Sequence, residues 1–375
     1  MDPVWLALPG FLIWSIVVAA PWRPWSTRES LDASGPAGDA DLSAVTVLIP
    51  ARNERGNITR ALKSLSMQGR DLKTIVIDDQ STDGTSAAAR ESGLGHLTLI
   101  AGQPPAAGWT GKLWALEQGR RIAATPYLLL LDADIELLPG TLPAMMDKLG
   151  AGQLGLVSLM ARLRMEGFWE KLLMPAFVYF FKLLYPFRLA NSDFRHLAAA
   201  AGGCILIRAD VLEQMGGFAA LRGELIDDCA LANRVKQMRF RTWLGLTHSA
   251  LSARPYPRLN DVWDMVARTA FTQLRYSAGM LLVCSALLLA AFVLPAVSLF
   301  QGEVRTVALA TLSLLLMCAS YLPVLRYYNL GAAWAVLLPA IGVLFLLMTW
   351  TSALRYWFGP GSSWKGRHYP RPGKA

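Results

Sequence analysis

Hydrophobic residues form long runs at the two ends of the chain and short runs in its middle. Residues 4–20 are an apolar run without a charged residue, and three longer runs occupy residues 280–300, 307–325 and 332–354. Each of these three is close to the length of about 20 residues with which a helix crosses the hydrocarbon core of a bilayer. The pattern therefore predicts a polar domain between an N-terminal membrane anchor and about three transmembrane helices in residues 280–355.

Short apolar runs in residues 43–257 alternate with stretches of helical periodicity. Such short continuous runs are typical of strands that are buried on both faces of a parallel sheet. Strands that alternate with helices imply right-handed crossovers. We therefore predict an α/β domain with a mostly parallel, Rossmann-like sheet. The predicted strands are residues 45–49, 74–77, 97–100, 127–131 and 204–207.

The charges beside the first apolar run indicate its orientation. Arg23 and Arg28 follow the run, whereas a signal peptide carries its positive charge before the run. Because positive charge is concentrated on the cytoplasmic side of a membrane, residues 1–25 are expected to be an uncleaved anchor that ends in the cytoplasm. Residues 26–42 are rich in Ser, Gly, Ala and Asp and are predicted to be a linker.

The segment of residues 168–187 combines many aromatic residues and leucines with scattered charges. One interpretation is a buried helix of the core. The other is an interfacial helix that lies on the membrane, with Lys182 and Arg188 reaching the lipid headgroups. We favour the interfacial helix, because membrane segments are predicted on both sides of the domain.

The C-terminal tail conflicts with a simple count of crossings. With the α/β domain inside, three crossings place the basic tail of residues 356–375, which includes Lys365 and Arg371, outside. The positive-inside rule predicts the opposite. Either one of the three runs is re-entrant or interfacial, or the rule does not hold here. Residues 258–279 are expected to be a juxtamembrane segment between the domain and these runs.

Composition supports a membrane protein and disfavours other classes. Hydrophobic residues make up 54% of the 375 residues, and the mean hydropathy of +0.35 is too high for an ordinary soluble enzyme. The net charge of +9 arises from basic residues that cluster mainly beside the hydrophobic runs. No nucleic-acid-binding motif accompanies them, so we expect no nucleic-acid partner. The four cysteines are isolated and form no zinc or disulfide pattern.

Acidic residues follow two of the predicted strands. Asp78 and Asp79 follow one apolar run, and Asp132 and Asp134 follow a run of four leucines. In open α/β sheets, ligands bind beyond the carboxyl ends of the strands. The carboxylates of Asp132 and Asp134 face one side of an extended segment, where they can bind a hard divalent cation such as Mg²⁺ or Mn²⁺ together with a diphosphate. Clustered acids after a buried strand are costly without such a ligand.

These segments resemble glycosyltransferase family 2, the inverting enzymes with a GT-A fold. The sequence PARNE at residues 50–54 resembles the family's nucleotide loop, DDQSTDGT at residues 78–85 resembles its DDxSxDGT signature, and DAD at residues 132–134 matches its metal-binding motif. The resemblance extends over residues 45–255 in matching order. It implies that Asp132 and Asp134 hold the Mg²⁺ or Mn²⁺. It also implies a set of donor-binding residues, with Asp79 on the uracil base: Pro50, Arg52, Glu54, Asp79, Asp83 and Asp132.

A general base is the next requirement. Inverting transfer is a direct displacement at the anomeric carbon, so the acceptor hydroxyl must lose a proton. The family has a pair of acids before a helix, with the second acid as the base, and Asp227 and Asp228 stand in the matching place. The resemblance therefore implies Asp228 as the base, with Asp227 as its catalytic neighbour. The alternative is that both acids only stabilise a helix N-terminus, which is worth under about 1 kcal/mol each.

Further residues are assigned to the two substrates. Lys112 opens a helix-like stretch and is expected to face the donor diphosphate, with a solvated surface lysine as the alternative. Arg367 lies in a tail that resembles the C-terminal WxGRxY of lipid-directed members. It is a second candidate for the donor phosphates, or else part of a basic tail that binds headgroups. The candidates for the acceptor side are Gly202, Gly203 and His196.

The pattern most resembles the hopene-associated and ceramide-glucosyltransferase-like branch of the family. That resemblance implies a UDP-sugar donor, a lipid acceptor such as a hopanoid, and a multi-pass protein of the cell inner membrane with a cytoplasmic catalytic domain. Processive members carry Gln-x-x-Arg-Trp near the membrane, and Gln273 is misplaced relative to Arg275-Tyr276 here. This difference favours transfer of a single sugar. The alternatives are a processive polysaccharide synthase and a catalytically silent membrane scaffold with the same fold.

Overall fold

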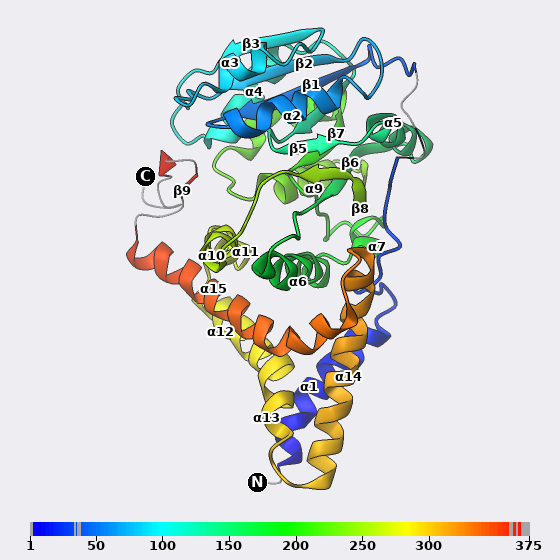
Figure 1. Ribbon diagram of the computed structural model, residues 1–375, viewed down its shortest axis with the longest axis vertical. Helices are drawn as coiled ribbons and strands as arrows, with labels where there is room; N and C mark the ends of the chain where they lie inside the picture. The colour runs from blue at the N-terminus through cyan, green and yellow to red at the C-terminus, as the bar shows by residue number, and fades with distance from the viewer. Residues whose placement is uncertain (1–2, 34, 36–38, 360–362, 365–366, 369–375) are drawn as a thin grey trace.

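The polar domain is built around an eight-stranded sheet with the strand order β3-β2-β1-β4-β7-β6-β8-β5 (Figure 1). The computed structural model describes residues 3–33, 35, 39–359, 363–364 and 367–368. All seven residues of β1 are buried, as a strand with helices on both faces requires. The strands are β1 (Val45–Ala51), β2 (Lys73–Asp78), β3 (Leu97–Ala101), β4 (Tyr127–Leu131), β5 (Ile135–Leu137), β6 (Leu154–Arg162), β7 (Cys204–Arg208) and β8 (Arg241–Ser252).

The sheet is parallel on one side and mixed on the other. Strands β3, β2, β1 and β4 pair in parallel. Beyond them, β7 is antiparallel to both β4 and β6, β8 is parallel to β6, and β5 is antiparallel to β8. The predicted parallel arrangement is therefore confirmed for the first four strands. The reversal at β7 was not predicted, because an apolar run carries no information about strand direction.

Helices cover both faces of this sheet. On one face, alternate residues of β1, such as Val47 and Ile49, pack with Ile58 and Leu62 of α2. On the other face, Leu48 packs among residues of α4 and α9, as the two-residue period of a strand requires. The helices of the domain are α2 (Arg55–Leu65), α3 (Thr85–Arg90), α4 (Gly111–Ile122), α5 (Thr141–Ala151), α8 (Ala209–Gln214), the 3₁₀ helix η1 (Gly217–Leu221) and α9 (Asp227–Gln237).

Three C-terminal helical segments are long and apolar enough to cross a membrane, namely Ala278–Ser298, Val304–Tyr327 and Ala332–Phe358. The N-terminal helix is shorter, at 16 residues, and packs against them: the indole of Trp14 donates to the carbonyl of Ala291 at 2.8 Å. The elements are α1 (Val4–Ala19), α12 (Ala278–Leu288), the π-helical η2 (Leu289–Val293), α13 (Leu294–Ser298), α14 (Val304–Tyr327), the 3₁₀ helix η3 (Ala332–Leu337) and α15 (Leu338–Phe358).

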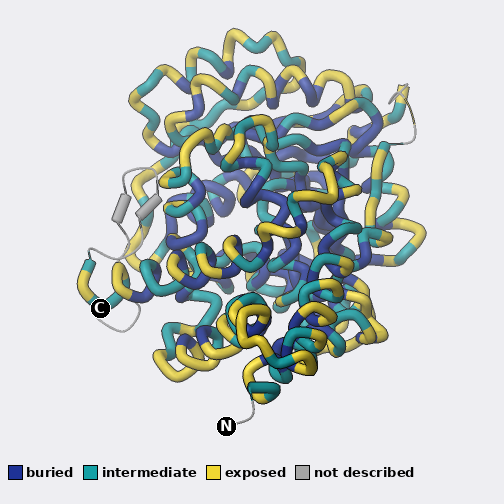
Figure 2. The backbone as a smooth tube through the Cα atoms, turned by 60° about the horizontal axis from the view of Figure 1, so that its bottom comes forward, coloured by how far each residue is buried: buried dark blue, intermediate teal, exposed yellow. Residues whose placement is uncertain are grey.

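The last of these helices has a different direction from the others. Helices α1, α12–α13 and α14 extend away from the sheet along the long axis of the molecule, whereas α15 runs obliquely beneath the polar domain (Figure 1). In its apolar window 44% of the residues are buried, against 28% and 33% in the other two. Figure 2 views the molecule with the bottom of Figure 1 turned toward the reader. In this view the exposed positions of the apolar helices lie on their outer sides. Helix α15 is thus a layer between the polar domain and the remaining helices.

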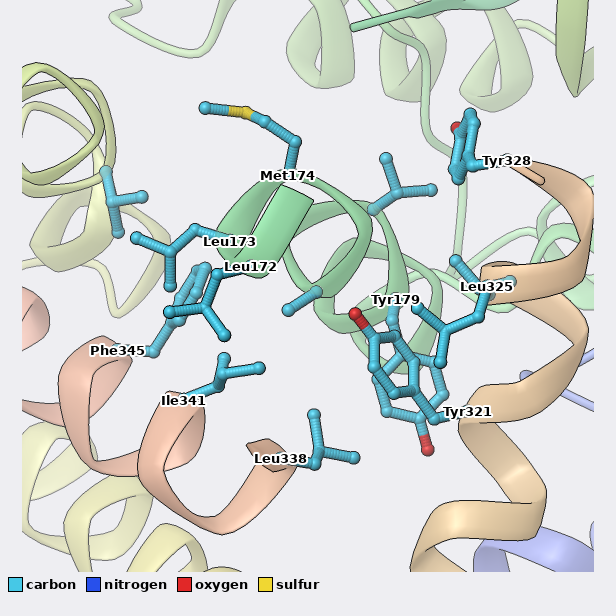
Figure 3. Close-up of a cluster of buried hydrophobic side chains, with 14 of the residues drawn as sticks. Leu172, Leu173, Met174, Tyr179, Tyr321, Leu325, Tyr328, Leu338, Ile341 and Phe345 are labelled. Atoms are coloured by element: carbon cyan, nitrogen blue, oxygen red, sulfur yellow. The ribbon is translucent and has the colours of Figure 1, made fainter. Parts of the chain in front are cut away.

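Helix α6 (Phe168–Leu184) lies directly above this layer. Its residues Leu172, Leu173 and Tyr179 pack against α14 and α15 (Figure 3). Lys182 is also buried, and its ammonium lies 4.2 Å from the ring centre of Phe187. The expectation that Lys182 reaches the headgroups is therefore wrong, because the side chain turns inward. The other elements of this layer are α7 (Phe187–Ala190), α10 (Leu259–Ala267) and α11 (Ala270–Gln273).

The predicted linker is partly fixed to the domain. The amide of Leu31 donates to the carbonyl of Leu246 at 3.0 Å, and the amide of Leu246 donates to Glu29 at 2.9 Å. Asp32 accepts hydrogen bonds from Thr247 and His248. These contacts attach residues 29–32, which lie between α1 and the sheet, to β8. They therefore restrict the orientation of α1 relative to the domain.

Candidate active site

Most of the predicted site residues converge on one edge of the sheet, around a cavity of about 330 Å³. Strand β4 ends at Leu131 opposite Cys204, the first residue of antiparallel β7. The amide of Asp132 then donates to the carbonyl of Gly203 at 3.0 Å. This pairing brings the loop before β7 against the acids that follow β4. The predicted residues that line the cavity are Pro50, Arg52, Glu54, Lys112, Asp132, Asp134, Gly202, Gly203, Asp227 and Asp228.

Lys112 lies among the carboxylates at the N-terminus of α4. Its ammonium is 2.7 Å from Asp132 Oδ1 and 3.9 Å from Asp227 Oδ2, and it donates to the carbonyl of Gly202 at 3.4 Å. Burial works against the charge, but Asp132 and then Asp227 raise the pKa of Lys112 above its ordinary value. The side chain is 23% exposed, so the alternative of a solvated surface lysine is wrong.

Asp227 and Asp228 are the first two residues of α9. Both acids therefore also stand where they can stabilise the N-terminus of a helix, which is the alternative role. The carboxylate of Asp228 accepts a hydrogen bond from the amide of Cys229 at 2.7 Å. Burial, followed by the neighbouring charge of Asp227, raises the pKa of Asp228 to about 6. A carboxyl group with such a pKa is suited to exchanging a proton near neutral pH.

Gly202 allows these groups to approach one another. A Cβ atom at this position would lie 3.2 Å from Asp228 Oδ2 and 3.4 Å from the ammonium of Lys112. A side chain would therefore press on the charged atoms of both residues. At Gly203, a Cβ atom would meet only the side chain of Ile135, at 3.2 Å.

Arg254 completes the site, although it was not predicted. Its Nε donates to Asp134 Oδ2 and its Nη2 to Glu54 Oε1, both at 2.9 Å. Burial is the main cause that raises the pKa of Asp134, and Arg254 opposes it. Arg254 follows β8 on the edge where the acids gather. Residues 241–252 were not among the predicted strands, so the sequence analysis had no local signal that places Arg254 at this edge.

Three of the predicted residues lie outside the described lining of the cavity. Asp79 is buried, and its carbonyl accepts a hydrogen bond from Arg52 at 2.6 Å. Asp83 accepts from the amides of Arg55 and Thr85, so it shapes the loop before α3. His196 is exposed and packs edge-on against its near neighbour Phe194, because the buried stretch before β7 begins only at residue 198.

Arg367 lies in the short strand β10 (Arg367–His368), which pairs with β9 (Ser363–Trp364). The side chain of Arg367, and with it the predicted contact with the donor phosphates, lies outside the described part of the structure.

Apolar side chains also line the cavity. Met160 and Leu163 come from the end of β6 and the loop after it, and Phe177 and Phe181 come from α6. Pockets that combine an apolar surface with a few polar groups are typical of sites for small organic ligands. One cavity is thus lined both by clustered charges and by aromatic and aliphatic side chains.

Comparison with solved structures defines the class of the fold. A mannosyltransferase from Pyrobaculum calidifontis, in complex with GDP-Man and Mn²⁺, superposes with a TM-score of 0.58, covering 94% of this chain and 98% of that chain at 18% sequence identity. The mixed sheet, with acids at its carboxyl edge, is therefore the GT-A fold of glycosyltransferases. Residues 46–216 match the family model of Glycosyl transferase family 2.

Curated relatives are similar over a shorter segment. The 4,4'-diaponeurosporenoate glycosyltransferase of Staphylococcus haemolyticus is 37% identical over 94 residues, and that of Staphylococcus aureus strain MRSA252 is 38% identical over 96 residues. Each alignment covers 25% of this chain and 25% of the relative. The chain therefore matches about a quarter of the length of these relatives.

Proposed function

We propose that the protein transfers a single sugar from a nucleotide diphosphate sugar to a lipid acceptor at the cytoplasmic face of a membrane. The observation that carries the proposal is a cavity lined both by Asp228, Asp132 and Lys112 and by apolar side chains of α6. The charged residues suit a sugar diphosphate, and the apolar residues suit a lipid. A silent scaffold has no need for this cluster, because buried charges are costly unless they are used or paired.

The general base in this proposal is Asp228. The acceptor hydroxyl gives its proton to the Asp228 carboxylate as its oxygen attacks the anomeric carbon, and the diphosphate leaves from the opposite side, so the configuration is inverted. The amide of Cys229 orients the carboxylate through Oδ1. Asp227 raises the pKa of this base, which strengthens it as a proton acceptor.

Lys112 and the metal serve the donor. Lys112 is close enough to Asp132 to turn from that carboxylate toward a diphosphate bound beside it. Asp132 and Asp134 supply the hard oxygen ligands that Mg²⁺ and Mn²⁺ prefer, and such an ion would neutralise charge on the leaving diphosphate. The described residues contain no third His, Cys, Asp or Glu grouped with them, so the diphosphate and water would complete the coordination.

The nucleotide is proposed to be uridine diphosphate. The support is the resemblance of residues 78–85 to the family signature and of residues 50–54 to its nucleotide loop. The Pyrobaculum mannosyltransferase was solved with GDP-Man, so guanosine donors are the comparison that a test must include.

The acceptor is proposed to be a lipid, and among lipids a hopanoid. The support is the pair of apolar lining residues Phe177 and Phe181, which belong to α6, a helix that packs against α14 and α15. The curated relatives are named for transfer to 4,4'-diaponeurosporenoate. The hopanoid itself is supported by the branch resemblance alone.

We propose further that α15 lies along the membrane surface rather than across it. The oblique course of α15 beneath the domain supports this orientation, as does its larger buried share of 44%. Strand β9, which follows α15, lies on the same side of that helix as the sheet (Figure 1). Helices α1, α12–α13 and α14 then make three crossings from an outer N-terminus, and the basic tail stays inside with the catalytic domain.

The test is lipid mass spectrometry on membranes that contain the protein, incubated with Mg²⁺ or Mn²⁺ and a panel of UDP- and GDP-sugars. A hopanoid-containing lipid extract is the acceptor, and Asp228→Asn is the matched control. We expect a lipid heavier by one sugar unit, formed with a UDP-sugar and lost in the variant. Polymer formation would indicate a processive synthase. The absence of any product with every donor would contradict the proposal.

A further inference from the structure

A second cavity, of about 490 Å³, adjoins the active site. It lies between α10, α11 and the C-terminal part of α15, and it shares Arg254, Tyr256 and Arg268 with the active-site cavity. The two spaces are therefore neighbours with a common wall. The side chains that define the second cavity are Arg254, Tyr256, Arg268, Tyr276, Arg355 and Tyr356.

The acids at this cavity already have partners. Asp264 forms an ion pair with Arg355 at 2.7 Å. Asp261 accepts a hydrogen bond from the amide of Arg258 at 2.9 Å, at the start of α10. Arg254 is held by Asp134 and Glu54 on the active-site side.

Arg268 provides the surplus positive charge. Within the described part of the chain its side chain forms no ion pair or hydrogen bond, although it faces both cavities. Tyr256, Tyr276 and Thr272 line the same cavity, and the hydroxyl of Thr272 donates to that of Tyr276 at 3.2 Å, which leaves the Tyr276 hydroxyl free to donate to a ligand. A guanidinium with several hydroxyl donors around it suits a group with two or more anionic oxygens, such as a phosphoryl group.

The cavity lies at the C-terminal end of the apolar helix α15, which in the orientation proposed above is the level where polar headgroups meet the hydrocarbon core. Tryptophans are enriched at this depth of a membrane, and Trp263, Trp350 and Trp357 lie in this region. The indole of Trp263 donates to Thr351 of α15 at 3.1 Å. This position favours a ligand that comes from the membrane.

The wall on the α11 side is held in an unusual backbone conformation. Arg275 and Tyr276 both have left-handed backbones, with φ of 52° and 56°. Such residues persist where the surrounding structure fixes them. The ring of Tyr276 stacks on that of Tyr356 at 4.5 Å, so α11 and α15 are fastened to each other at the cavity.

From this arrangement we propose that the second cavity binds the phosphoryl headgroup of an anionic membrane phospholipid, with Arg268 as its main contact. The inference rests on the membrane orientation proposed above and does not depend on sugar transfer. The lipid is distinct from the acceptor in this proposal, because Asp228 lines the active-site cavity and not the second cavity. A bound headgroup fastens the joint between α15 and the catalytic domain.

Native mass spectrometry of the full chain in detergent tests this site, with phosphatidylglycerol as the probe and phosphatidylcholine for comparison. We expect phosphatidylglycerol to bind more tightly, and Arg268→Gln to weaken that binding about tenfold through loss of a charge-assisted contact. Arg268→Lys should retain part of it. Arg258→Gln is the matched control, since Arg258 is exposed, lies at the start of α10 and is outside the lining. Because Arg268 is itself exposed, its replacement leaves the packing intact.

Two outcomes would overturn the proposal. One is equal affinity of wild type and Arg268→Gln for phosphatidylglycerol. The other is a pair of results: UDP or inorganic phosphate displaces phosphatidylglycerol, and Arg268→Gln binds UDP about tenfold more weakly than wild type. Together these results would assign the cavity to the sugar donor. The Asp228→Asn variant should bind the lipid like wild type. Headgroup binding without sugar transfer would thus preserve this site while refuting the proposed reaction.

Discussion

The protonation of Asp228 should be visible in the pH dependence of transfer. The general base proposed above must be deprotonated to act, and the pKa of Asp228 is raised to about 6 by burial and by Asp227. We therefore expect kcat/KM to rise as the pH increases through about 6 and to level off above it, since this parameter reports the free enzyme. In Asp227→Asn, removal of the neighbouring negative charge lowers the pKa of Asp228 and moves the rising limb to lower pH. An unmoved limb would contradict this electrostatic coupling, whatever the absolute rate of the variant.

Arg254 should act as an internal counter-ion for Asp134 and Glu54. Arg254→Gln leaves two poorly exposed carboxylates without their cation, so we expect the melting temperature to fall by about 5 °C. Mn²⁺ supplies positive charge at Asp134 and should raise the melting temperature of this variant more than that of wild type. Arg254→Lys retains the charge and serves as the control. Equal shifts with Mn²⁺ in all three proteins would show that Arg254 and the metal do not share a ligand.

At the level of residues, the sequence predicted the acids better than their counter-ions. Asp132 and Asp134 follow a strand and Asp227 and Asp228 begin a helix, both of which are readable from the sequence, and all four acids line one cavity. Arg254 was missed because its partners lie 120 and 200 positions away in the chain. His196 was proposed from its nearness in sequence to β7, but side-chain direction in an irregular loop has no local signature.

At the level of elements, the pairing of β4 with β7 places the Gly202 loop against α9. Gly202→Ala should lower kcat/KM at least about tenfold, because the added Cβ would lie 3.2 Å from Asp228 and 3.4 Å from Lys112. Gly203→Ala is the matched control, since its Cβ would meet only the side chain of Ile135, and we expect it to retain most activity. Steady-state kinetics of both variants, with circular dichroism to verify folding, makes the comparison. Equal losses would indicate a general disturbance of the loop.

The positions of the strands were predictable from apolar runs, but their directions were not. The run at residues 204–207 became β7, which is antiparallel to β4, and only the long path through α6 and α7 explains its reversal. Helix α6 shows the same limit. Its aromatic residues fit a membrane surface and a protein interior equally well, and the packing partners on α14 and α15 bury Tyr179 fully and Phe180 in part, whereas Phe168 stays exposed.

At the level of the whole molecule, the orientation of α15 distinguishes the two explanations of the basic tail. Either one of the three apolar runs does not cross the membrane, or the positive-inside rule does not hold here. Composition and length alone made α15 a third C-terminal crossing, which put the tail outside. Its oblique course beneath the catalytic domain could not be predicted from hydropathy, because a helix that is covered by protein on one side and lipid on the other is as apolar as one that spans. With α15 on the membrane surface, the positive-inside rule and the structure agree.

Cysteine labelling in intact cells tests this topology. The turn between α13 and α14 is at the far end of the apolar helices from the sheet, and Gln301 is exposed there. Gln301→Cys should therefore react with a membrane-impermeant maleimide from outside. Lys374→Cys in the tail should react only after the membrane is permeabilised. The unsubstituted chain is the control, because its four cysteines are buried or half-buried. Labelling of Lys374→Cys in intact cells would mean that α15 crosses the bilayer, and would leave the tail too far from the active site for Arg367 to reach the donor.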